Sequence, residues 1–174
     1  GFYKSWGHHD EAHIQHVCIM AKYLYQVDVV EKHLDAPRAE QEAIAETFNS
    51  LIRAAIWHDA GRVNELIDSN HGRDSYKIWL DNSGEEPDDV AEFLMTFHCK
   101  DDSDAEEVFS TQFKDREYSQ YIWEALSALK DADALDRWRF GWVCKDFVNA
   151  AMLRSQTSRD LMLVAGTLQM TKFK

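Results

Sequence analysis

Residues 51–59 read Leu-Ile-Arg-Ala-Ala-Ile-Trp-His-Asp, an apolar helical run that ends in an adjacent imidazole and carboxylate. A run of this composition packs against other helices, so it places His58 and Asp59 at the buried end of a helix, where water is scarce. Both side chains are good ligands for divalent metals. The stretch therefore predicts a core helix that carries potential metal ligands at its C-terminal end.

Length and composition favour a single helical domain. A chain of 174 residues can bury most of its apolar surface without disulfides or structural metals. Its 6 Trp, 6 Tyr and 9 Phe supply large buried area, whereas 7 Gly and 2 Pro are few for the turns of an all-β fold. Apolar residues recur at helical spacing, without strand alternation. We therefore expect an all-α, single-domain bundle over residues 1–174.

The charge and the cysteine content restrict which binding partners and which cellular compartment we expect. The 19 Lys+Arg against 31 Asp+Glu give a net charge of -12, which argues against a nucleic-acid duplex because a phosphate backbone needs a basic face. Apolar stretches fall short of the roughly 20 residues of a membrane span, and the N-terminal residues do not resemble a signal peptide. Cys18, Cys99 and Cys144 show neither disulfide parity nor zinc-knuckle spacing. We expect a cytoplasmic protein with reduced thiols and no membrane contact.

The apolar periodicity predicts helices along most of the chain. Five helices carry histidine or aspartate at an end or along an apolar stripe; they are expected at about 9–27, 37–59, 70–82, 87–98 and from 118 past 129. Pro37 suits the first position of the second helix, and Gly84 follows the third. Residues 101–107 read as a solvated loop or a helix start. Packing helices are expected at 147–153 and 160–170.

Six candidate metal ligands lie on these five helices: His13, His58, Asp59, His71, His98 and Asp133. Helical bundles build metal sites from side chains on facing helices, and imidazole with carboxylate suits divalent cations. Neighbouring helical residues point about 100° apart, so His58 and Asp59 share one cation only at a distorted helix end, unless Asp59 bridges two. The pattern predicts one or two divalent ions and leaves Mn, Mg, Co, Ni, Fe and Zn open.

Five segments, in this order, resemble the motifs of the HD superfamily of metal-dependent phosphohydrolases. They are residues 9–17 (His-Asp-Glu-Ala-His-Ile-Gln-His-Val), 54–62 (Ala-Ala-Ile-Trp-His-Asp-Ala-Gly-Arg), 71–75, 97–102 and 130–137. The resemblance covers residues 9 to about 140, and we expect the helices within 141–174 to pack on that part. His16 stands where the family frequently has arginine. The resemblance implies a first metal site formed by His13, His58, Asp59 and Asp133. For members with two metals it implies a second site, formed by His71 and His98.

The resemblance also implies a reaction. A small phosphorylated substrate, such as a nucleotide, would be hydrolysed by attack of metal-bound hydroxide at the Asp59 centre. Basic residues beside the motifs would grip phosphate, and Arg62 would also offset charge on the phosphoryl group; they are Arg62, Arg73, Lys100 and Arg137. Asp131 would orient a ligating histidine through a hydrogen bond, and either Asp131 or Glu65 would transfer protons. A capped helix end is the plain alternative for His58-Asp59, surface salt bridges are the alternative for the basic residues, and a solvated carboxylate is the alternative for Asp131.

Two other functions fit the same residues. Some relatives with this six-ligand arrangement are dinuclear iron oxygenases, in which two irons bind O₂ and an organic substrate. A non-catalytic nucleotide-sensing module is the third possibility, although such a module is expected to have degenerate metal motifs and every expected ligand is present here. Two irons with an oxo-bridge absorption would indicate the oxygenase. Metal-dependent phosphate release would indicate the hydrolase, and nucleotide binding that survives chelation would indicate the sensor.

Overall fold

The computed structural model describes residues 11–63, 68–137 and 148–171 of the chain. The regular elements in these ranges are all helical: α1 (Glu11–Asp28), η1 (Val30–His33), α2 (Arg38–Trp57), α3 (His71–Ser83), α4 (Asp89–Phe97), α5 (Asp102–Gln112), α6 (Gln120–Asp136), η3 (Ala150–Met152) and α7 (Gln156–Thr171). η1 and η3 are short 3-10 helices. The expected all-α bundle is confirmed, and within these ranges no helix is long and apolar enough to cross a bilayer.

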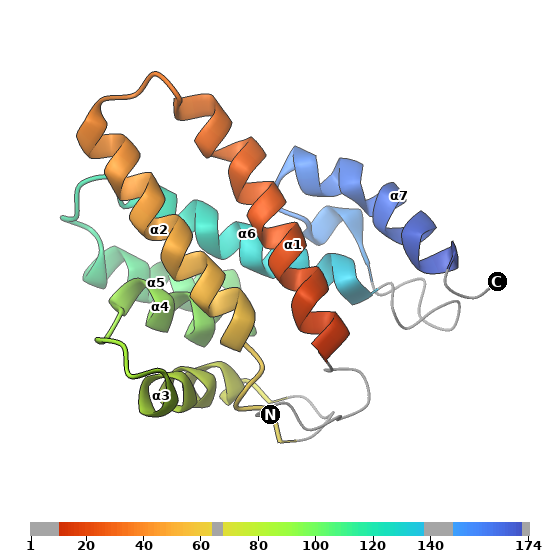
Figure 1. The fold of residues 1–174 in the computed structure, drawn as a ribbon, viewed down its shortest axis with the longest axis horizontal. Helices are drawn as coiled ribbons and strands as arrows, with labels where there is room; N and C mark the ends of the chain where they lie inside the picture. Colours follow the sequence, from red (N-terminus) through yellow and green to blue (C-terminus); the bar gives the residue numbers. More distant parts are fainter. Residues whose placement is uncertain (1–10, 64–67, 138–147, 172–174) are drawn as a thin grey trace.

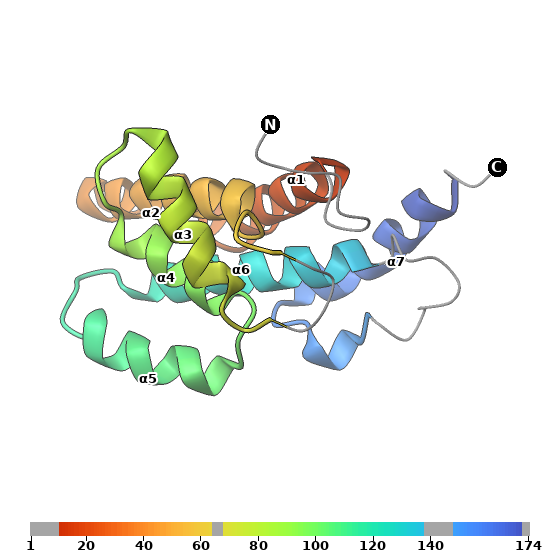
Figure 2. The same ribbon diagram turned by 90° about the horizontal axis from the view of Figure 1, so that it is seen from below.

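The central helix of the bundle is α6. It packs against α1, α2, α4 and α7, while α2 also contacts α1 and α4. Figures 1 and 2 show α3 lying across the end of α2 and α4, with α5 and α7 on opposite flanks of α6. The apolar stripes of these helices meet in one core, which includes Leu24, Leu51, Leu94, Leu126 and Leu129. The buried faces of α1, α2, α4 and α6 are the apolar stripes that the sequence pattern predicts.

The helix boundaries follow the sequence signals with small shifts. Pro37 lies at the N-cap of α2 rather than at its first helical position, and α2 ends at Trp57, so His58 and Asp59 follow the helix. Gly84 adopts a left-handed φ of 68° after α3, as a helix-ending glycine does. The acidic stretch from residue 101 is the start of α5, which confirms the helix-start alternative for this stretch. The helix expected at 147–153 is only the 3-10 turn η3, with residue 147 outside the described ranges.

Two glycines allow the turn after α2 and the start of α3 to pack closely. A Cβ atom on Gly61 would lie 2.5 Å from the backbone nitrogen of Ser75, and one on Gly72 would overlap the carbonyl oxygen of Met95 on α4. Ser75 Oγ accepts a hydrogen bond from Gly61 N (2.8 Å) and donates one to His58 O (2.6 Å). The segments that follow α2 and α4 are therefore held against the first turn of α3.

Asp131 joins α6 to the segment before α7. Its carboxylate is buried and accepts hydrogen bonds from Arg154 N (2.8 Å) and Nη1 (3.1 Å), Ser155 N (3.2 Å) and Ser158 Oγ (2.6 Å). Arg154 Nη2 also donates a hydrogen bond to Asp102 Oδ1, at the start of α5. These bonds correct the expectation that Asp131 orients a metal-binding histidine. A carboxylate saturated in this way is also a poor proton carrier, so its role is to anchor the C-terminal segment.

Replacing Asp131 by alanine tests this anchor. The change leaves the Arg154 guanidinium and two backbone N–H groups without their buried acceptor, so the free energy of unfolding should fall by about 2–4 kcal/mol. Urea denaturation followed by circular dichroism measures it. Asp160→Ala is the control, because Asp160 is exposed on α7 and accepts only a surface bond from Gln156; it should change stability by less than about 0.5 kcal/mol. Equal effects of the two changes would contradict the anchoring role.

Candidate metal centre

All six predicted ligands meet at one end of the bundle. His13 comes from α1, His58 and Asp59 follow α2, His71 is the first residue of α3, His98 follows α4, and Asp133 lies on α6. Five of the six are buried, and Asp133 is the exception, with its side chain 22% exposed. The ligands lie near the ends of α1, α2, α3 and α4 and on one face of α6. Residues up to 120 positions apart in the chain therefore share this site.

The carboxylate of Asp59 lies between two pairs of imidazole rings. Its Oδ2 is 3.3 Å from His13 Nε2 and 3.4 Å from His58 Nε2. Its Oδ1 is 3.1 Å from His71 Nε2 and 3.7 Å from His98 Nε2. Each oxygen therefore faces its own pair, which is the arrangement of a carboxylate that can bridge two cations.

The two rings of each pair present their Nε2 atoms to one another. The Nε2 atoms of His13 and His58 are 3.2 Å apart, and those of His71 and His98 are 3.0 Å apart. Asp133 Oδ1 lies 3.5 Å from His13 Nε2 and so adds an oxygen to the first pair. Two ligands bound at 2.0–2.1 Å to one ion lie about 3.0–3.4 Å apart at ordinary coordination angles. The two Nε2–Nε2 spacings therefore fit the edges of two coordination shells.

The opposite nitrogen of each ring determines what these Nε2 atoms can do. In every case Nδ1 meets an acceptor, which requires the proton to be on Nδ1 and leaves Nε2 of the neutral ring with a lone pair. The acceptors are Asp136 Oδ2 for His13 (2.7 Å), Ala55 O for His58 (2.9 Å), Met95 O for His98 (2.6 Å) and Asp68 O for His71. Lone pairs that face one another in a buried site need a proton or a cation between them. These buried groups could thus hold a metal ion.

The charges around Asp59 follow from this packing. Burial raises the pKa of Asp59, but the surrounding rings of His58, His13 and His71 outweigh it and hold that pKa well below its usual value. Burial lowers the pKa of His98, and the neighbouring His58 and His71 lower it further. For His71, burial is outweighed by hydrogen bonds to Asp59 and Cys99, which raise its pKa to about 10. Without a cation, a proton on His71 supplies the positive charge beside the Asp59 carboxylate.

Asp136 supports the first pair of rings and was not anticipated from the sequence. Its buried carboxylate accepts hydrogen bonds from His13 Nδ1 at 2.7 Å and from His16 Nδ1 at 2.8 Å. Such a partner fixes the tautomer and the orientation of a ligating ring. The signal that could have found it is spacing: Asp133 and Asp136 are three positions apart on α6 and lie on the same side of that helix. Asp136 thus performs the orienting role that the sequence predicted for Asp131.

The predicted phosphate-binding residues are distributed unequally. Arg62 Nη1 lies 3.5 Å from His71 Nδ1, and Arg137 Nη2 lies 4.0 Å from Asp133 Oδ2, so both border the centre. The ammonium of Lys100 lies over the Phe97 ring, 5.4 Å from its centroid. Arg73 is exposed on α3, and Glu65 is outside the described residues. The structure thus places two of the four basic residues beside the candidate ligands.

Comparison with known proteins adds no family to this description. No protein-family model, curated protein or solved structure matches the chain. Any functional conclusion therefore depends on the motif order in the sequence and on the geometry of the six ligands.

The raised pKa of His71 leads to a prediction about pH. Because this pKa is about 10 without a cation, His71 is protonated near neutral pH and must release that proton when a cation binds. The low pKa values of Asp59 and Asp133 keep both ionised and outside this exchange. Affinity for the ion at His71 should therefore increase with pH, by about tenfold per unit between pH 6 and 8 for one released proton.

Isothermal titration calorimetry in buffers of different ionisation enthalpy counts the released proton. The matched variants are His71→Gln, which should lose the release, and His33→Gln, which should keep it because His33 bonds to Val29 O away from the centre. Affinity that is independent of pH in the wild type would contradict the role of His71.

Proposed function

We propose that this chain is a metal-dependent phosphohydrolase that acts on a small phosphorylated substrate. The observation that carries the proposal is the Asp59 carboxylate between two imidazole pairs whose lone pairs converge. Five ordered motifs that resemble the HD superfamily support it from the sequence. The reaction requires a hydroxide source and positive charge near the phosphoryl group, and the buried ligands are suited to hold cations that supply both.

The ligands divide between two ions. His13, His58 and Asp133 would hold the first, His71 and His98 the second, and Asp59 would contact both through its two oxygens. A bound divalent cation supplies Lewis acidity and lowers the pKa of a coordinated water to near neutrality. The protein's own contribution is to keep six side chains in place before substrate arrives, through the carbonyl, carboxylate and glycine contacts described above.

The substrate would approach over Asp133. The side chains of His13, His58, Asp59, His71 and His98 are 0–3% exposed, whereas that of Asp133 is 22% and that of Arg137 is 45% exposed. Arg137 stands at this edge and would donate to phosphoryl oxygens through its forked N–H groups. Because the whole protein is strongly acidic, local arginines rather than an extended basic face select for one small phosphate group.

His16 would transfer the proton in this scheme. It follows His13 by three positions on α1, its side chain is 29% exposed, and Asp136 holds its Nδ1. A partly exposed imidazole in a fixed orientation can give a proton to a leaving-group oxygen. It replaces Asp131, whose carboxylate is occupied by the C-terminal segment.

A dinuclear iron oxygenase is the second candidate. The four histidines favour it, because imidazole suits iron and zinc better than magnesium, which prefers oxygen ligands. The distinction is experimental: two irons per chain with an oxo-bridge absorption, and oxygen consumption without phosphate release, would favour oxidation over hydrolysis.

Metal analysis and a phosphate-release screen test the proposal. The purified protein would be stripped with chelator, reloaded separately with Mn²⁺, Mg²⁺, Co²⁺, Ni²⁺, Fe²⁺ and Zn²⁺, and assayed on nucleotides and sugar phosphates. We expect bound transition metal at up to two ions per chain and cation-dependent release of phosphate. No release with any cation, from protein that is shown to be loaded, would contradict hydrolysis of these substrates.

Asp59→Ala is the decisive variant because the Asp59 carboxylate lies between both imidazole pairs. Bound metal and turnover should both fall, by more than the roughly 10–100-fold that loss of a supporting hydrogen bond costs a metal site. Asp101→Ala is the control, since Asp101 is an exposed carboxylate at the start of α5. A folded Asp59→Ala protein that keeps its metal and its activity would refute the assignment.

A further inference from the structure

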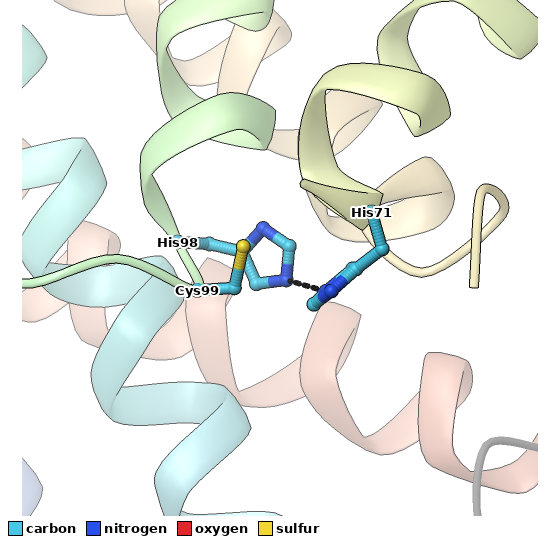
Figure 3. A group of neighbouring side chains, drawn as sticks. All are labelled: His71, His98 and Cys99. Atoms are coloured by element: carbon cyan, nitrogen blue, oxygen red, sulfur yellow. Dashed lines mark hydrogen bonds between the residues drawn. The ribbon is translucent and has the colours of Figure 1, made fainter. Parts of the chain in front are cut away.

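The second imidazole pair has a cysteine beside it. Cys99 directly follows His98 at the end of α4, and Figure 3 shows its sulfur beside the ring of His98, with the ring of His71 on the other side of His98. A ligand atom from each of these three residues lies within 4.8 Å of the other two. His71 and His98 are buried and Cys99 is half-buried. The thiol is therefore part of the buried cluster rather than an isolated surface group.

The sulfur makes long hydrogen bonds to two backbone carbonyls, in addition to its contact with His71. Cys99 Sγ donates to Ser69 O at 3.6 Å and to Thr96 O at 3.9 Å, and a thiol is a weak donor. The neighbouring His98 Nδ1, by contrast, is fixed to Met95 O at 2.6 Å. The sulfur can therefore leave its two backbone partners at small cost, while the His98 ring stays in place.

Counting ligand atoms shows why the sulfur matters. The first side of the centre has four protein groups, His13, His58, Asp133 and Asp59, arranged as two nitrogens and two oxygens. The second side has His71 Nε2, His98 Nε2 and Asp59 Oδ1, which makes three. A closed tetrahedral site has four protein ligands. Among the described residues, Cys99 Sγ is a further ligand atom that lies within 4.8 Å of a ring nitrogen of both His71 and His98.

We propose that Cys99 is the fourth protein ligand of the ion at His71 and His98, and that this site therefore selects a zinc-like cation over magnesium or manganese. On binding, the thiol releases its proton to solvent and the sulfur lone pair forms the bond to the cation, without any redox change. Thiolate ligands favour zinc, whereas magnesium and manganese prefer oxygen. The inference rests on the metal-binding part of the proposed function and not on the reaction.

The two sites would then have different roles. A site with four protein ligands, all in the interior except the half-buried Cys99, is closed in the manner of structural zinc sites. The site beside Asp133 adjoins the exposed edge of the centre and is the one that substrate can reach. The ion at Cys99 would hold the shared Asp59 carboxylate in place for its neighbour.

Cobalt is the probe for this ligand. Chelator-treated wild-type protein loaded with two equivalents of Co²⁺ should show the near-ultraviolet charge-transfer absorption of a cobalt–thiolate bond. Cys99→Ser should lose that band and bind its second Zn²⁺ on the order of 10–100-fold more weakly. Cys18→Ser is the matched control, because Cys18 is a half-buried thiol on α1, and it should keep both properties. A wild-type protein with two cobalt ions and no such band, or a band that persists in Cys99→Ser, would overturn the proposal.

Alkylation of the wild-type protein provides a second measurement that does not depend on a variant. Zn²⁺ should slow the reaction of Cys99 with iodoacetamide at least tenfold, while Mg²⁺ at the same concentration leaves it unchanged; peptide mapping would follow Cys99 against Cys18. Equal reactivity with and without Zn²⁺ would contradict ligation. A cobalt–thiolate band without phosphate release would support Cys99 ligation and contradict the proposed hydrolysis. Phosphate release without the band would support the hydrolysis and contradict Cys99 ligation.

Discussion

Four imidazole Nε2 atoms and one carboxylate converge in a volume from which water is largely excluded, and this concentration of lone pairs is the constraint on which the rest of the structure depends. Lone pairs brought together in the interior repel one another and have lost their hydration, so the arrangement is stable only with positive charge among them. In the absence of a cation, the raised pKa of His71 supplies that charge as a proton. A divalent ion on each side of Asp59 supplies it more completely.

The surrounding fold is arranged to keep those lone pairs pointing inward. Carbonyl oxygens one helical turn earlier, at Ala55 and Met95, fix the rings of His58 and His98. Two glycines let α3 approach closely enough to bring His71 opposite His98. These contacts form within the protein without any ion, so the cost of ordering the ligands is met during folding rather than at binding.

Helix α6 shows how one helix serves three purposes through spacing alone. Asp133 and Asp136 are about 60° apart around its axis, so one contributes a ligand atom and the other orients His13. Asp131 and Asp133 are about 160° apart by the same measure, which turns Asp131 away toward Arg154 and Ser158. The metal centre and the anchor of the C-terminal segment are thus built on opposite faces of a single helix.

Three features could be predicted from the amino-acid sequence alone. They are the helices, the six residues that meet at the centre, and the possibility that the Asp59 carboxylate contacts two ions. These features can be read because apolar periodicity and helix-end signals are local, and because His58-Asp59 adjoins an apolar run that must be buried. The three-dimensional packing was needed to show that Asp136 rather than Asp131 supports His13, 123 residues away in the chain, and that the Cys99 sulfur lies within 4.8 Å of a ring nitrogen of both His71 and His98. Those outcomes depend on which helix faces meet and on how closely glycine lets them approach, and no pattern within one segment records the partner it will face.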